Sequence, residues 1–127
     1  MVTQKDLQEL IAFRGEGAPV LSLYLDTDLN RQPKDKCKLV LREKLEAVAG
    51  ICLSSDLERA EQFFEYEYDW QGLSVALFSC QEHGFWRVYT ISAPIRDAAF
   101  CATEPYIKPL VVFSRYESGY NPSPDGK

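Results

Sequence analysis

The segment that decides the fold is residues 69–91, which read DWQGLSVALFSCQEHGFWRVYTI. Residues 73–80 alternate between two sets of side chains, and both sets are largely apolar. A strand that is apolar on both sides is typical of the centre of a sheet whose two faces are covered. Residues 81–84 supply a polar turn, and residues 85–91 are rich in the aromatic and β-branched side chains of a returning strand. The segment predicts a β-hairpin in the middle of a sheet, with these core residues: Val75, Leu77, Trp86 and Val88.

The chain before this hairpin predicts three helices and one strand. Thr3, with Asp6 three residues later, is typical of the start of a first helix. Residues 20–26 alternate as a strand, and residues 34–52 carry an apolar stripe at helical spacing. Residues 55–58 read Ser-Asp-Leu-Glu, which resembles a capping box at the start of a third helix.

The chain after the hairpin predicts extended structure. Residues 98–102 are typical of a strand, and the prolines within 104–110 disfavour a helix there. Residues 111–113 predict a short edge strand, and residues 113–127 a polar tail that follows a domain spanning 1–112. The order α-β-α-α-β-β-β predicts an α+β fold, a two-layer sandwich with a mixed sheet of four or five strands and about three helices. The strand at 20–26 and the hairpin are expected to be parallel neighbours.

Composition narrows the class of protein. The 127 residues suffice for one domain, and 46% hydrophobic residues indicate a globular chain. A formal net charge of -5 disfavours nucleic-acid binding over the whole surface but leaves a local basic patch open. The sequence has no signal-peptide pattern and no apolar run near the roughly twenty residues of a membrane span. We therefore expect a cytoplasmic protein with no membrane partner.

Metal and cysteine chemistry is not indicated. Cys37, Cys52, Cys80 and Cys101 have no C-x-x-C spacing and one histidine to join them, so we expect buried, reduced thiols, no metal and no cofactor. Asp26 and Asp28 follow a strand, where carboxylates could bind a metal or act in a hydrolase, but turn chemistry explains them as well. His83 falls in the predicted turn and has no partner for catalysis, so we expect no catalytic residues.

A basic ridge is the candidate surface for binding RNA. Its side chains recur along the second predicted helix and the loop before it: Arg31, Lys34, Lys38 and Arg42. Positive side chains are what contact with RNA phosphates requires. The alternative is a solvated helix face, paired in part with the acidic residues of the third helix, Glu58, Glu61 and Glu65.

Several segments together resemble one family. They read VLSLYLDTD (20–28), DWQGL (69–73), VALFSC (75–80), GFW (84–86) and PYIKPL (105–110). In this order and spacing, they resemble the amino-terminal domain of the bacterial and archaeal relatives of the eukaryotic-type peptide chain release factor. The resemblance covers about residues 1–112, and it implies an α/β domain that precedes an RNase H-like domain in that family.

The departures from the family limit what the resemblance implies. The chain contains no Gly-Gly-Gln, the sequence of the loop that promotes peptidyl-tRNA hydrolysis, and neither stop-codon-reading motif of the eukaryotic factor's first domain, Asn-Ile-Lys-Ser and Tyr-x-Cys-x-x-x-Phe. We therefore expect a truncated relative, or a domain working alone, that is not an enzyme. The expected function is a translation-related module that binds RNA, the ribosome or tRNA, or a protein. The alternative is a protein-interaction domain that associates with itself as a homo-oligomer.

Overall fold

A four-stranded antiparallel sheet forms the centre of the molecule, in a computed structural model that describes the backbone of residues 2–117 and the side chains of residues 2–113. The elements follow in the order α1 (Gln4–Ala12), β1 (Val20–Asp26), α2 (Lys34–Ala47), α3 (Ser54–Gln62), a π-helical turn (Phe63–Glu67), β2 (Ser74–Cys80), a 3-10 turn (Gln81–His83), β3 (Phe85–Ile91), β4 (Ala98–Ala102) and α4 (Lys108–Glu117). The α+β class and the strand number are confirmed.

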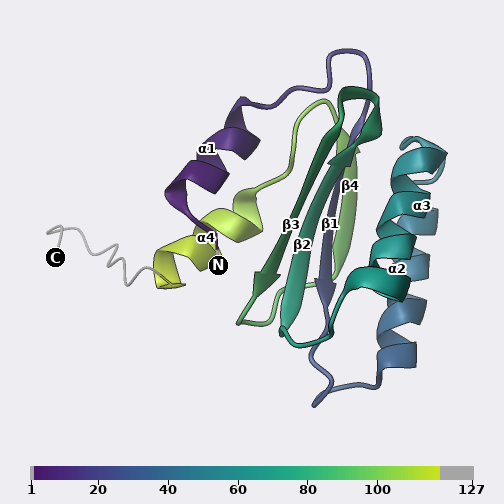
Figure 1. Ribbon diagram of the computed structural model, residues 1–127, viewed down its shortest axis with the longest axis vertical. Coiled ribbons are helices and arrows are strands. Elements are labelled where there is room, and N and C mark those ends of the chain that lie inside the picture. Colours follow the sequence, from purple (N-terminus) through teal and green to yellow (C-terminus); the bar gives the residue numbers. More distant parts are fainter. Residues whose placement is uncertain (1, 118–127) are drawn as a thin grey trace, which may run out of the picture.

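The strand order is β3-β2-β1-β4, and every neighbouring pair is antiparallel. The prediction of a mixed sheet, with β1 and β2 parallel, is therefore wrong. The reason lies in the connection: two helices that run in opposite directions return the chain to the end of the sheet that β1 leaves, so β2 starts there and runs back (Figure 1). A single crossover helix would have given the parallel pair.

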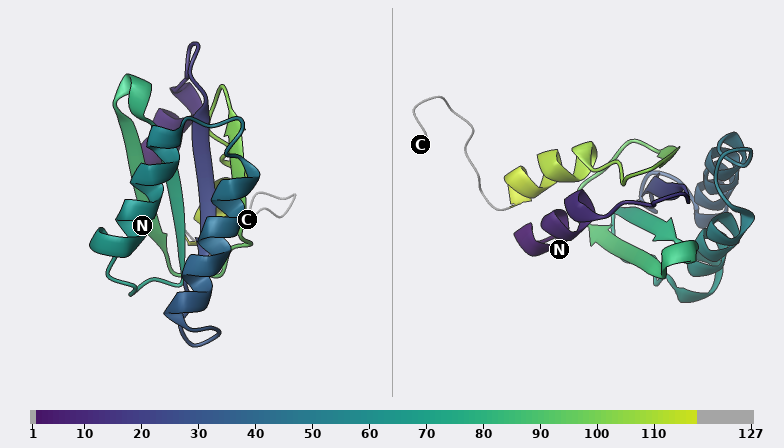
Figure 2. Two further views of the ribbon diagram at one scale, coloured as in Figure 1. Left: turned by 90° about the vertical axis from the view of Figure 1, so that its right-hand side faces the viewer. Right: turned by 90° about the horizontal axis from the view of Figure 1, so that it is seen from above.

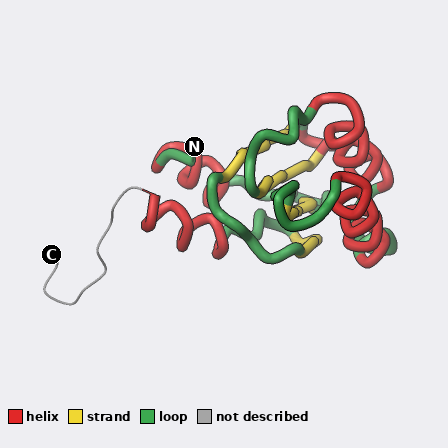
Figure 3. Tube along the Cα trace, turned by 90° about the horizontal axis from the view of Figure 1, so that it is seen from below, coloured by secondary structure: helices red, strands yellow, loops and turns green. Residues whose placement is uncertain are grey.

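Helices cover both faces of the sheet. α1 and α4 lie against one face and α2 and α3 against the other, so the molecule has three layers instead of the two predicted (Figures 1 and 2). The view from below shows the same two groups of helices on either side of the strands (Figure 3). All seven residues of β1 and of β2 are buried. This burial is the arrangement that the two-sided apolar pattern of 73–80 requires.

The predicted hairpin forms, but only its first strand is central. Val75 and Leu77 in β2 are fully buried, as expected. β3 is an edge strand, and Trp86 and Val88 are only partly buried against the core. The guanidinium of Arg59 lies 4.1 Å from the Trp86 ring centroid, so a charged side chain covers that part of the strand.

α4 replaces the end of the extended segment predicted for 104–110, from residue 108 onward, and the edge strand predicted for 111–113, whereas residues 104–107 are not helical. Proline is tolerated in the first turn of a helix, because the backbone N–H it lacks would be unpaired there. Pro109 occupies this place in α4, and Leu110 and Phe113, three residues apart, are buried against the α1 side of the sheet. α4 also runs across the expected domain boundary at 112, whereas residues 118–127 of the expected tail lie outside the described residues.

The helix ends on the other face also differ from prediction. α2 ends at Ala47, and residues 48–52 continue as hydrogen-bonded turns around Gly50. α3 starts at Ser54 without a side-chain cap, so the expected capping box does not form. Asp56 is instead fully buried, and its Oδ1 accepts hydrogen bonds from Ser79 Oγ at 2.6 Å and from the Gln81 amide at 2.9 Å. These bonds fasten the start of α3 to the end of β2.

Candidate interaction surface

The basic ridge lies beside acidic side chains. Lys38 Nζ donates to Glu65 Oε2 at 2.8 Å, and Arg31 Nη1 donates to Asp26 Oδ2 at 2.9 Å. The Lys34 ammonium is 5.4 Å from the Trp70 ring centroid. The hydrogen bond from Lys38, together with the charges of Lys38, Arg42 and Lys34, lowers the pKa of Glu65. Lys38, Arg42 and Lys34 thus all stabilise the charge of one carboxylate. This pairing agrees with the alternative interpretation, in which the ridge is a helix face partly paired with acidic side chains.

An open groove runs between α2 and α3 where these charges meet. Its lining contains one ridge residue among acidic and neutral side chains: Arg42, Glu58, Glu61, Gln62, Glu65 and Tyr66. The repulsion between a phosphate and the three carboxylates outweighs its attraction to the one guanidinium. The groove therefore gives little support to a phosphate-binding surface centred on Arg42.

Asp26 and Asp28 form two consecutive turns. Asp26 Oδ1 accepts from the Asp28 amide at 3.0 Å, and Asp28 Oδ1 accepts from the Asn30 amide at 2.9 Å. Asp97, which the sequence analysis did not single out, accepts from the Asp26 amide at 2.6 Å. Burial, followed by the charge of Asp26, raises the pKa of Asp97. Across the described part of the chain, no group of three or more His, Cys, Asp and Glu side chains is placed to hold a metal ion.

His83 joins the turn before β3 to the loop before β1. Its Nε2 contacts the carbonyl oxygen of Gly15, and its ring packs edge-on against Phe13 with centroids 6.3 Å apart. Phe13 in turn stacks on Phe85 at 3.8 Å. The exposed histidine thus packs against a segment that is distant in the sequence, and its position in a turn does not predict this contact.

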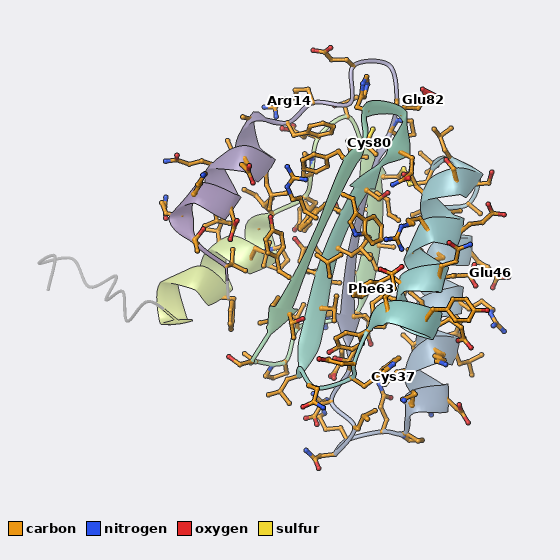
Figure 4. The ribbon with its side chains drawn as sticks, viewed as in Figure 1. Arg14, Cys37, Glu46, Phe63, Cys80 and Glu82 are labelled. Atoms are coloured by element: carbon orange, nitrogen blue, oxygen red, sulfur yellow. A yellow bond between two sulfur atoms is a disulfide. The ribbon has the colours of Figure 1, made fainter. Side chains whose placement is uncertain are left out.

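Two of the four cysteines form a disulfide, which corrects the expectation of four reduced thiols. Cys52, in the loop after α2, is bonded to Cys101 in β4. Cys37 and Cys80 are free and buried, and they lie near opposite ends of the sheet (Figure 4). Burial raises the pKa of both thiols, which favours the protonated form over the nucleophilic thiolate. The bonded cysteines are 49 residues apart, and the sequence contains no short-range signal of their pairing.

The outer edge of β4 is the most distinctive surface. β4 is the last strand of the sheet and is paired with β1 alone among the described strands. Its residues, Ala-Ala-Phe-Cys-Ala, include neither a charge nor a proline. Phe100 is 36% exposed and Tyr106 is 38% exposed, and their rings pack together with centroids 4.2 Å apart. The edge strand and these two rings, here called the β4 surface, form an uncharged, partly apolar margin.

Hydrogen bonds from β1 hold Tyr106 beside this margin. The Tyr106 amide donates to Ser22 Oγ at 2.9 Å, and the buried Tyr24 hydroxyl donates to the Tyr106 carbonyl oxygen. Ser22 and Tyr24 lie on the α1 and α4 side of β1, so the segment that contains Tyr106 crosses that face of the sheet. No described strand pairs with the outer edge of β4.

Comparison with known proteins adds no assignment, because neither a protein-family model nor a curated protein matches the chain. None of the helices described within residues 2–117 is both long enough and apolar enough to cross a membrane.

Proposed function

We propose that this chain is a non-enzymatic protein-interaction module that binds its partner by strand addition at the β4 surface. The observation that carries the proposal is an uncharged terminal strand with two exposed aromatic rings beside it. An edge strand presents backbone N–H and C=O groups that pair readily with another strand. Aromatic rings such as Phe100 and Tyr106 are enriched at protein interfaces.

β3, the strand at the opposite edge of the sheet, differs from β4 because it carries a charged side chain. β3 carries Arg87, which lies 3.5 Å from Glu9 of α1 and 4.7 Å from the Phe85 ring centroid. A charged side chain of this kind is one of the means by which proteins discourage pairing at an edge strand. β4 has no equivalent charge, so strand addition is favoured there over β3.

The resemblance to the release-factor family supports a role for this module in translation. A cytoplasmic location remains a prediction of the sequence. The Cys52–Cys101 disulfide is an argument against a strongly reducing compartment, since disulfides persist mainly where conditions are oxidising.

The non-enzymatic part of the proposal is supported by the turn-forming roles of Asp26 and Asp28 and by the protonated state favoured for both free thiols.

The test compares substitutions at the two edges of the sheet. Phe100→Lys places a charge on the β4 surface, and Thr90→Lys places one at an exposed position of β3 as the matched control. We expect proteins retained by the immobilised chain from a ribosome-containing extract to be lost with Phe100→Lys and kept with Thr90→Lys. Equal retention by both variants, with both folded by circular dichroism, would show that β4 is not the binding surface.

The second candidate function is RNA or ribosome contact through the basic ridge. Its support is the exposure of Arg31, whose side chain is 61% exposed despite its bond to Asp26, and of Lys34 and Arg42. Co-sedimentation with ribosomes or tRNA at two salt concentrations tests it. We expect phosphate-mediated binding to weaken with salt and with Lys34→Glu, and binding that responds to neither would exclude this candidate.

A further inference from the structure

We infer that the strand added to the β4 surface is β4 of a second copy of this chain, in an antiparallel pair with Phe100 on the two-fold axis. This inference rests on the function proposed above and names its partner. Antiparallel pairing of a strand with its own copy is a closed, isologous contact. It would extend each four-stranded sheet into one sheet of twice that size, in which the two β4 strands are central.

The composition of β4 suits this self-pairing. Phe100 is the middle residue of Ala98–Ala102, so placing it opposite its copy pairs Ala98 with Ala102 at both ends. Directly opposite residues share a face of the sheet, with Cβ atoms about 5 Å apart. The two Phe100 rings would therefore meet between the two Tyr106 rings, in one aromatic cluster. The alanines leave room for the backbones to approach.

Charges at the two ends of β4 supply complementarity. Arg96 lies two residues before the strand and Glu104 two residues after it. In the antiparallel register with Phe100 on the axis, Arg96 of each copy comes to the end where Glu104 of the other copy lies. Glu104 contacts Arg14 of its own chain at 3.3 Å, and this exposed ion pair is weak enough to exchange. The same self-pairing in parallel would place like charges together.

The disulfide fixes the strand that would pair. Cys101 is in β4, and its bond to Cys52 ties the edge strand to the loop after α2. Ala99 and Cys101 point to the α2 and α3 side, where they pack against the core. Phe100 points to the other face and is exposed. The edge is therefore held in one register and one orientation before a second copy arrives, which lowers the entropic cost of pairing.

Sedimentation velocity of the full chain from micromolar to millimolar concentration tests the inference. We expect a concentration-dependent dimer whose dissociation constant rises at least about tenfold with Phe100→Lys and changes less than about twofold with Thr90→Lys. Arg96→Glu and Glu104→Arg should each weaken the dimer, and the double variant should restore it. Lys5→Glu, on α1, is the charge control, because α1 contacts β3 at the other edge of the sheet.

The outcomes separate this inference from the proposed function. A monomer at every concentration, combined with loss of retained proteins in Phe100→Lys, would overturn self-pairing and leave strand addition to a different protein standing. A dimer that is insensitive to Phe100→Lys would also overturn self-pairing, because it would form through another surface. A monomer whose retained proteins are unaffected by Phe100→Lys would overturn both.

Discussion

Removing the Cys52–Cys101 bond is expected to destabilise the fold by about 4 kcal/mol. The figure comes from the loop-closure entropy that a cross-link between cysteines 49 residues apart removes from the unfolded chain. For a urea dependence near 2 kcal/mol per molar, the unfolding midpoint should fall by about 2 M on reduction. The bond joins an edge strand to the helical layer on one face, so its loss should loosen β4 before the central strands.

Alkylation and urea unfolding together check this prediction. Of the four cysteines, two should react in denatured protein before reduction and all four after it. The Cys52→Ala, Cys101→Ala double variant should match reduced wild type to within about 1 kcal/mol and be insensitive to reductant. The Cys37→Ala, Cys80→Ala variant, the control, should keep its response to reductant. Four reactive cysteines before reduction, or an unchanged midpoint after it, would refute the reasoning.

Three further predictions concern stability measured by urea unfolding. Leu77→Ala, at a fully buried site, should cost about 2–5 kcal/mol, whereas His83→Ala should cost about 1 kcal/mol through its contact with a backbone carbonyl; equal costs would contradict the placement of the hairpin. Asp56→Ala should cost about 1–3 kcal/mol, because two hydrogen-bond donors lose their acceptor, and Asp56→Asn should lose less. Burial raises the pKa of Tyr24 above the ordinary 10.0 and that of Tyr89 to about 12. Stability should therefore be complete below about pH 10 and fall as the pH rises further, less steeply in Tyr24→Phe; a flat profile would contradict this.

The sequence predicts the centre of the fold well because its signal there is local and redundant. Residues 73–80 are apolar on both faces, and a central, doubly covered β2 follows from that pattern alone. The cap formed by Thr3 and Asp6 at the start of α1 is also present as predicted. In both cases the residues that carry the signal are the residues that make the contacts.

The errors arise where the outcome depends on distant partners. The direction of β2 depends on how α2 and α3 pack, which the two apolar stripes do not specify. Pro105 and Pro109 disfavour a helix locally, yet Leu110 and Phe113 gain burial against the sheet only when the segment from residue 108 is helical. Asp56 lies within the segment predicted to cap the third helix, but its carboxylate is bonded to the end of β2. Tertiary burial outweighed local preference in each case.

The β4 surface was not predicted as a site, because neither its composition nor its local pattern marks it in the sequence. Its strand is short and rich in alanine, so in sequence it resembles the least informative part of a sheet. The capacity of this strand to pair with another depends on strand order. In a central position, the same five residues would be paired on both sides and could not accept a further strand. Here β1 and β2 take the central positions because they are apolar on both faces, and the weaker pattern of β4 leaves it at the end of the sheet. The pattern that fixes the core therefore also determines which strand is left at the edge of the sheet.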